Sequence, residues 1–196
     1  MTRTYQKTKR AEREAETRRR IVEATVALHT SVGPARTTIS AIADKAGVQR
    51  HTVYAHFPEE GTLFAACTSH WALLHPFPAA EPWEAAADPL ERLALALRDV
   101  WGWYADVESD LEIFFRDAEL VPAVRADMTR YADGLTTIAD RLAADLGGSS
   151  TVRAAVGHAL AFETWRSLVR REGLTTAGAV GAMLALVEQL SGVRAA

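Results

Sequence analysis

Four neighbouring residues, Arg50, His51, Thr52 and Tyr54, form the part of this 196-residue sequence best suited to recognising another molecule. The forked donors of arginine match the O6 and N7 atoms of guanine, and hydroxyl groups commonly bind backbone phosphate. The four residues lie in the segment 37–57, TTISAIADKAGVQRHTVYAHF, which has the form of two short helices joined by a glycine turn. This pattern predicts a helix-turn-helix, whose second helix enters the major groove of DNA.

The first helix of the motif is predicted from its apolar period. Ile39, Ile42, Ala43 and Ala46 recur at positions i, i+3, i+4 and i+7, which places them on one face of an α-helix. The hydroxyl of Thr38, just before this run, can cap the helix. The motif therefore has both an inward face and a start signal.

The second helix is predicted over Gln49–Ala55. Gly47 supplies the backbone freedom to end the first helix and turn sharply. Val48 and Val53 can pack inward, which leaves the polar side chains facing outward. Pro58 disfavours helical geometry at the residue before it, so the helix should stop there.

The charge of the chain is divided between its two parts. Residues 1–57 contain 11 Lys or Arg and 5 Asp or Glu, whereas residues 58–196 contain 11 and 20, although the whole chain has a net charge of only −3. A basic N-terminal part is expected where a small domain meets a polyanion. A solvated basic helix would explain the charge alone equally well, and the helix-turn-helix decides in favour of DNA.

Composition sets the broad class. With 48% hydrophobic residues the chain can bury a core, and no stretch is long and apolar enough to predict a membrane span. The first 20 residues lack the apolar segment of a secretory signal. The single cysteine, Cys67, suits a reducing compartment and is more typical of a small core residue than of a reactive thiol. We therefore expect a cytoplasmic protein with no membrane partner.

Periodicity predicts an all-α fold with two domains. We expect a helix-turn-helix DNA-binding domain with a basic N-terminal arm over 1–57 and a helical ligand-binding and dimerisation domain over 58–196. The expected helices outside the motif are Glu12–Ser31, Glu59–His75, Pro89–Asp106, Asp110–Asp117, Pro122–Leu146, Thr151–Glu172 and Thr175–Gly192.

The segment 38–57 resembles the DNA-binding domain of the tetracycline-repressor (TetR) family of transcriptional regulators. The resemblance is carried by Thr38-Ile39-Ser40-Ala41-Ile42-Ala43, by Ala46-Gly47-Val48 and by Thr52-Val53-Tyr54-Ala55-His56-Phe57. With the rest of the N-terminal block the resemblance covers about a quarter of the chain, whose length and all-helical pattern also fit the family. The resemblance implies a dimeric regulator, more often a repressor, that a small-molecule effector releases from a palindromic operator on double-stranded DNA.

The resemblance also implies which residues approach DNA. Thr38, Thr52, Tyr54 and His56 would lie against backbone phosphate, whereas base edges would be read from the recognition helix. The full expected set is Thr38, Gln49, Arg50, His51, Thr52, Tyr54 and His56. Phe57 is expected to be packed in the core.

One position departs from the family pattern. Glu60 stands where the family commonly has a lysine close to phosphate. An acidic residue suits a helix N-terminus, but it puts that phosphate contact in question. Arg18, Arg19 and Arg20 can compensate if their side chains are available to DNA.

The last two predicted helices are expected to form the dimer contact. They carry many alanine and glycine residues, which permit close helix approach, together with Leu184, Val187 and Leu190. Packing within one subunit would explain this composition too. We favour a four-helix contact between two subunits, because one recognition helix reads only a few base pairs and a twofold dimer presents two.

Aromatic and polar residues of the second part form a candidate effector pocket. Any one aromatic taken alone is more typical of ordinary core, but the cluster together with the family resemblance indicates a pocket. The candidate residues are Trp101, Tyr104, Glu112, Phe115, Arg116, His158, Phe162 and Trp165.

Enzyme chemistry has little support in the sequence. The six histidines lack the spacing of a helical zinc site, and no phosphate-binding glycine loop or G-x-S-x-G elbow occurs. We expect no catalytic residues, no metal and no cofactor. Two alternatives stay open: a carboxylate-based enzyme, and a nonspecific or ligand-independent DNA-binding protein with strong salt dependence.

Overall fold

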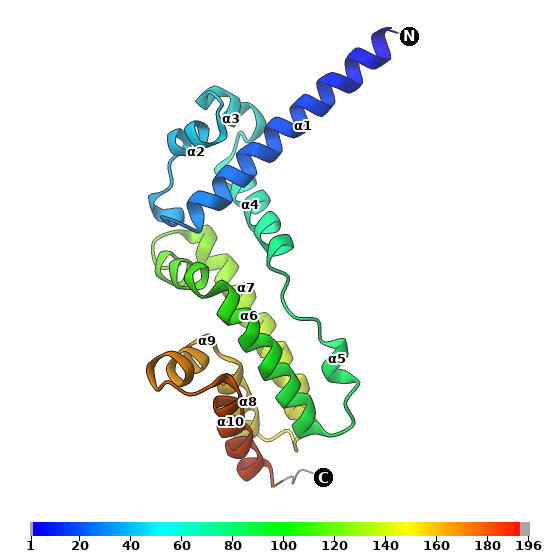
Figure 1. Cartoon of the computed structure of the whole chain (residues 1–196), viewed down its shortest axis with the longest axis vertical. Helices are drawn as coiled ribbons and strands as arrows, with labels where there is room; N and C mark the ends of the chain where they lie inside the picture. The colour runs from blue at the N-terminus through cyan, green and yellow to red at the C-terminus, as the bar shows by residue number, and fades with distance from the viewer. Residues whose placement is uncertain (1, 193–196) are drawn as a thin grey trace. The chain divides into compact units, whose positions relative to one another are not determined.

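The computed structural model describes the backbone of residues 2–192 and the side chains from Thr8 onward. Within this range the chain forms helices and no strand, so the predicted all-α class is confirmed (Figure 1). None of the described helices combines the length and the apolar character needed to cross a membrane.

The chain forms two compact units. The first comprises the residues up to Pro76 together with Ser109–Met128, and the second comprises Phe77–Glu108 and the residues from Thr129 onward. The first unit therefore contains more than the expected DNA-binding segment. The functional boundary after residue 57 stays a prediction, because compactness alone does not test it.

The first unit is built around a helix-turn-helix. Its elements are α1 (Thr2–His29), the short 3₁₀ turn η1 (Pro34–Arg36), α2 (Ile39–Ala46), α3 (Arg50–His56), α4 (Glu60–Leu74), the end of α6 (Pro89–Asp117) and the start of α7 (Pro122–Ala144).

Apolar residues on four helices and the segment after α3 form the core of this unit. Ile21 of α1, Ile42 of α2, Val53 of α3 and Leu63 of α4 are buried together with Phe57. Helix α1 packs against α2 and α4, and α2 packs against α3. The inward faces predicted from helical spacing are thus the faces that meet.

The predicted start and turn of the motif are also found. Thr38 is the N-cap of α2, and its hydroxyl oxygen accepts a hydrogen bond from the Ala41 N–H at 3.2 Å. Gly47 ends α2 with a φ of 64°, a left-handed conformation that glycine adopts without strain. Gln49 is the N-cap of α3 rather than its first helical residue.

A buried carboxylate joins the end of α6 to the turn between α1 and α2. Asp117 is only 1% exposed, and it accepts hydrogen bonds from the Ala35 N–H at 2.9 Å and from Arg116 Nε at 2.7 Å. Arg116 also donates to the Val32 carbonyl at 3.1 Å. Gly33 has a φ of 97°, and a Cβ there would collide with both Arg116 and Asp117. The turn therefore needs a glycine for its backbone and for the close approach of this pair.

Two more carboxylates attach α4 to the end of α6 and the start of α7. Asp110 of α6 accepts a hydrogen bond from Trp71 Nε1 at 2.7 Å. Asp127 of α7 accepts one from the Thr68 hydroxyl at 2.8 Å. These contacts explain why 109–128 belongs to the first compact unit although it lies far away in sequence.

The second unit contains the remaining helices. They are α5 (Glu81–Glu84), the first part of α6, the later part of α7, α8 (Ser150–Leu160), α9 (Phe162–Trp165), the π-helical segment η2 (Arg166–Arg171) and α10 (Thr176–Ser191).

Besides α1, which begins at Thr2 and was expected from about Glu12, two sequence expectations about helix boundaries were wrong. Helix α6 is continuous from Pro89 to Asp117, whereas two helices with a break after Asp106 were expected. Val107 and Leu111 are buried on α6, and the acidic residues between them, Glu108 and Asp110, are half-buried and bind Arg170 and Trp71, so they do not mark helix ends.

The second wrong expectation is a single helix over Thr151–Glu172. Ala161 is extended, with φ −69° and ψ 139°, and separates α8 from α9. The backbone carbonyls near the break have side-chain donors. Trp101 Nε1 donates to the Ala159 carbonyl at 3.1 Å, and the Tyr104 hydroxyl donates to the Leu160 carbonyl at 2.7 Å. These tertiary hydrogen bonds satisfy carbonyls that would otherwise be unpaired.

We predict that Asp117→Ala destabilises the first unit by about 2 kcal/mol, because the Ala35 N–H and Arg116 lose the buried carboxylate that is their acceptor. Burial alone raises the pKa of Asp117, but the hydrogen bonds from Arg116 and Ala35 and the charges of Arg116 and Arg36 lower it overall. The contribution of the Asp117 carboxylate to folding stability is therefore fully present above the ordinary carboxyl pKa. It is lost as the pH falls through the lower pKa that Asp117 has in the folded protein.

Urea unfolding followed by tryptophan fluorescence measures this effect. The exposed Asp106→Ala variant serves as the control and should change stability by less than about 0.5 kcal/mol. Equal stability of the two variants at pH 7 would contradict the structural role of Asp117.

His29 predicts a second pH dependence. Burial lowers the pKa of His29 to about 4, although the nearby Asp117 acts to raise it. The unfolded chain therefore binds a proton below about pH 6.5 that the folded chain does not. Stability should decline as the pH falls from 6.5 toward 4, by up to about 3 kcal/mol from this residue. In His29→Gln this part of the decline should vanish, whereas His70→Gln should retain it; parallel pH profiles for all three proteins would exclude the effect.

Candidate nucleic-acid interface and aromatic cluster

Helix α3 presents its polar residues on one exposed side. Val53 is fully buried beneath the helix and anchors it to the core. Arg50 and His51 are exposed, and Tyr54 is 45% exposed although it is a large aromatic residue. Their side chains are therefore available to a partner.

The other residues expected at DNA surround this side. Gln49 and Thr38 are exposed at the N-caps of α3 and α2, whereas Thr52 and His56 are half-buried. The Thr38 oxygen is an acceptor in its cap, so its hydroxyl proton remains for a phosphate oxygen. The DNA-contact roles of all these residues stay predictions.

An open groove of about 660 Å³ lies beside α3 within the first unit. Thr38 of α2, Arg50 and Tyr54 of α3 and Glu60 of α4 line part of it. Hydroxyl groups and one guanidinium suit phosphate, whereas the Glu60 carboxylate repels it. Glu60 thus places a negative charge at the edge of an otherwise anion-compatible surface.

The three consecutive arginines of α1 bind the protein itself. The Arg18 guanidinium carbon lies 4.1 Å from the centre of the Phe57 ring. Arg20 donates to the Gly47 carbonyl at 3.1 Å and also to the Ala46 carbonyl, at the C-terminal end of α2. Their expected availability for compensating Glu60 is therefore reduced.

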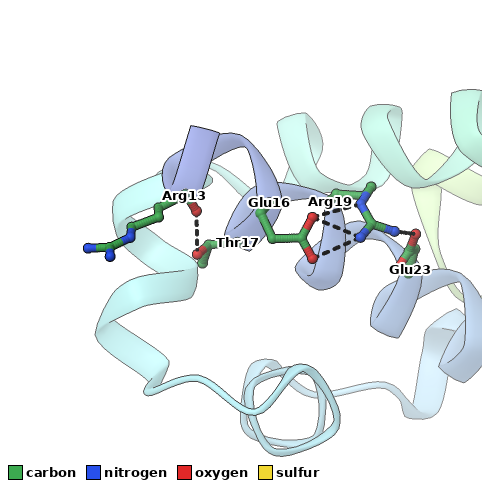
Figure 2. A network of polar contacts seen from close by, with 5 residues as sticks. All are labelled: Arg13, Glu16, Thr17, Arg19 and Glu23. Atoms are coloured by element: carbon green, nitrogen blue, oxygen red, sulfur yellow. Dashed lines mark hydrogen bonds and ion pairs between the residues drawn. The ribbon is translucent and has the colours of Figure 1, made fainter. Parts of the chain in front are cut away.

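Arg19 is held by two glutamates of its own helix, as Figure 2 shows. Its guanidinium lies 2.8 Å from Glu16 and 2.6 Å from Glu23. These hydrogen bonds and charges raise the pKa of Arg19. The exposed basic side chains of α1 that have no described ion pair, cation–π contact or side-chain hydrogen bond lie nearer its start, at Lys9, Arg10 and Arg13. Sequence reasoning missed these three as site residues, although their position outside the core stripe was a usable signal.

Tyr104, Phe162 and Trp165 form one buried aromatic cluster in the second unit, and a fourth expected effector residue, Trp101, is buried one turn before Tyr104 on α6. Trp101, Tyr104, Phe162 and Trp165 are each at most 2% exposed. The Tyr104 ring lies 5.3 Å from Phe162 and 5.9 Å from Trp165, measured between ring centres. The aromatic residues that helical spacing selected on α6 and on the segment after α8 are therefore in contact, as Tyr104, Phe162 and Trp165 show.

Hydrogen bonds hold Tyr104 in place. Its hydroxyl lies 2.7 Å from the Tyr131 hydroxyl of α7 and 2.7 Å from the Leu160 carbonyl. Burial is the main reason that the pKa of Tyr104 is raised, and Tyr131 adds to the shift. Tyr131 was not among the expected residues, because a single tyrosine on an otherwise mixed helix gives no pattern.

Trp165 carries a buried polar group without a partner. Its Nε1 has no hydrogen-bond acceptor among the described residues, although the side chain is 1% exposed. A buried unpaired N–H costs about 1–3 kcal/mol, so this donor indicates a position where an acceptor can be gained. The π-helical segment η2 follows directly, and such segments often occur at functional sites.

The other four expected effector residues lie elsewhere. Glu112, Phe115 and Arg116 belong to the first unit, where Arg116 is engaged with Asp117. His158 is exposed on α8, with its ring nitrogens 3.3–3.4 Å from the Thr164 hydroxyl. The structure therefore brings together most of the aromatic members of the expected set and leaves Phe115 and the polar members outside the cluster.

The last helices have a mixed surface. Helix α10 packs against α8 and buries Ala179, Val180 and Val187. Its other side exposes small and apolar residues, namely Gly181, Ala182, Ala185, Leu186 and Leu190. One side of α10 thus packs within the subunit. The small and apolar residues on its other side are exposed.

Comparison with known proteins identifies the N-terminal motif. Residues 21–67 match the family described as bacterial regulatory proteins, tetR family. This match covers α2 and α3 entirely and confirms the resemblance expected from residues 38–57. No curated protein matches the sequence.

Solved structures share the fold over most of the chain. A TetR-like transcriptional regulator from Rhodococcus sp. RHA1 is 22% identical, with a TM-score of 0.61, and the match covers 90% of this chain and 97% of that one. A second Rhodococcus regulator is 15% identical (TM-score 0.61; 91% and 99% covered). The multidrug binding protein EbrR, solved with imidazole, is 20% identical (TM-score 0.55; 92% and 93% covered). At these identities the likeness establishes the fold.

Proposed function

We propose that this chain, whose residues 21–67 match the tetR family of bacterial regulatory proteins and whose fold is that of TetR-like regulators, is a cytoplasmic, ligand-responsive repressor that binds a palindromic operator as a homodimer. The observation that carries the proposal is α3, a helix anchored by the buried Val53 with Arg50, His51 and Tyr54 exposed on its other side. An exposed arginine next to a histidine on a recognition helix suits base edges in the major groove.

Two copies are needed for useful specificity. One α3 contacts only a few base pairs, whereas a twofold dimer presents two such helices to half-sites about 34–36 Å apart. We assign the contact to α8 and α10. Gly181, Ala182 and Ala185 on the exposed side of α10 permit close helix approach, and Leu186 and Leu190 add apolar area there.

We assign effector binding to the aromatic cluster of the second unit. Its buried side chains are mostly apolar, and the unpaired N–H of Trp165 offers one directional contact. A neutral aromatic molecule with a hydrogen-bond acceptor fits these properties best, because the buried members of the cluster carry no charge to pair with an ion. The multidrug binding character of EbrR agrees with an effector of this general kind.

Helix α6 provides a route from effector to DNA. It carries Trp101 and Tyr104 of the aromatic cluster and, near its end, Asp117, which binds the turn before α2. An effector that binds two arrangements of α6 unequally would shift the position of that turn. A coupling of about 1–3 kcal/mol changes operator affinity by about 5–150-fold, and the operator must weaken effector binding equally.

Selection of bound DNA from a random library at physiological salt tests the proposed function. We expect one palindrome with half-sites one helical turn apart, and a dimer on it by sedimentation. Arg50→Ala should weaken binding to that palindrome by about tenfold or more and relax one base position, because each bidentate base contact contributes about 1–3 kcal/mol. Arg98→Ala, which removes an exposed arginine of the second unit, is the control. Recovery of no shared sequence would instead favour a nonspecific DNA-binding protein.

Trp165→Phe tests the effector assignment. Neutral aromatic molecules are screened for release of the wild-type protein from the selected operator. The variant should bind the active molecule about tenfold more weakly, because it cannot form a hydrogen bond that contributes about 1.4 kcal/mol. Trp83→Phe removes a buried indole that already donates to Asp99 and should leave the affinity unchanged. Equal affinity in wild type and Trp165→Phe would place the effector elsewhere.

A further inference from the structure

Helix α1 is longer than the core of the first unit requires. Buried residues of α1 begin at Ile21, and Arg18 is its first side chain with a described contact to α2, α3 or the segment after them. The side chains from Thr8 to Glu16 are all exposed. At about 1.5 Å per residue, the segment Thr2–Glu16 spans about 22 Å (Figure 1). We call this segment the α1 arm.

The α1 arm has a basic side. Lys9, Arg10 and Arg13 are exposed, and no ion pair with a described residue engages them. Arg13 stands three residues after Arg10 and four after Lys9, so the three cations share one side of the helix. Like charges at this spacing oppose helix formation in isolation, and a polyanionic partner would remove that cost.

The direction of this side is fixed by Arg20. Its guanidinium donates to the carbonyls at the end of α2, so this side of α1 faces the turn before α3. Arg13 precedes Arg20 by seven residues, almost two full turns, and Lys9 precedes Arg13 by four. Lys9 and Arg13 therefore continue, along α1, the side that faces the helix-turn-helix.

The acidic residues that border this side of α1 are already occupied. Glu16 and Glu23 stand three residues after Arg13 and Arg20, and both are bound by Arg19 (Figure 2). The arm also has few apolar residues, so it lacks both the stripe of a coiled coil and the apolar face of a membrane-bound helix. A partner recognised through charge alone fits this surface.

We propose that the α1 arm is a second DNA contact, which binds backbone phosphates outside the half-site read by α3. This inference rests on the proposed function. The arm supplies cations at a distance from the groove beside α3, where Glu60 introduces a negative charge. At about 3.4 Å per base pair, an arm of about 22 Å reaches about six base pairs of flanking DNA.

The test compares wild type with the triple variant Lys9→Gln, Arg10→Gln, Arg13→Gln. Glutamine keeps good helix propensity, and circular dichroism verifies that α1 is retained. Affinity is measured by fluorescence anisotropy over a range of salt concentrations, on the selected operator with and without ten base pairs of flanking DNA. The matched control is Glu12→Gln, Glu14→Gln, which removes charges of the opposite sign from the same exposed segment.

The triple variant should bind the flanked operator more weakly and with a smaller salt dependence. The slope of log K against log salt should decrease by about 0.9 for each phosphate that the protein no longer neutralises, up to about 5 for two arms with three cations each. Base preference should be unchanged. On the operator without flanks, wild type and triple variant should bind alike, and the control should keep the wild-type slope on both.

The inference is overturned if the triple variant keeps the wild-type affinity and slope on flanked DNA, or if its affinity falls equally with and without flanks. Failure of the proposed function gives a different result, because then the wild type selects no palindrome. In that case the same slope difference, measured on long and short duplexes of random sequence, still decides whether the arm binds DNA.

Discussion

The arrangement of the first unit depends on one buried carboxylate. Asp117 ends α6 and is desolvated, and it is stable there because it accepts hydrogen bonds from the Ala35 N–H and from Arg116. These bonds attach α6 to the turn that precedes α2. Gly33 completes the constraint, since any side chain there would displace the pair. The turn before the DNA-binding motif is thereby held by the end of α6, within the same compact unit.

What the sequence predicts well is structure encoded within a few residues. The helical spacing of Ile39 and Ile42, the Thr38 cap and the Gly47 turn are local, and the structure has each of them. The break at Ala161 and the continuity of α6 across Asp106 depend on contacts with residues far away in the sequence. Trp101 and Tyr104 supply donors to the carbonyls beside Ala161 from 56–58 residues away, so no pattern around Ala161 predicts the break.

The same limit applies to charged side chains. Arg18, Arg19 and Arg20 are identical in type and adjacent in sequence, yet one covers Phe57, one binds two glutamates and one caps the end of α2. Their common charge does not decide between these uses, because helical geometry sends them in three directions. The same holds for the candidate site. The exposed residues of α3 are predicted from the motif, whereas the availability of an arginine or an aromatic side chain depends on its contacts within the folded protein.

The two units differ in how completely their buried polar groups are satisfied. In the first unit Asp117 and the indole N–H of Trp71 have partners, and the corresponding group of Trp165 in the second unit has none among the described residues. A satisfied network favours one arrangement, whereas an unpaired donor lowers the stability of the ligand-free state by about 1–3 kcal/mol. A ligand that supplies an acceptor would remove this cost, but only in an arrangement in which the Trp165 N–H can hydrogen-bond to the ligand. Such a differential contact is what a ligand needs in order to shift a conformational equilibrium.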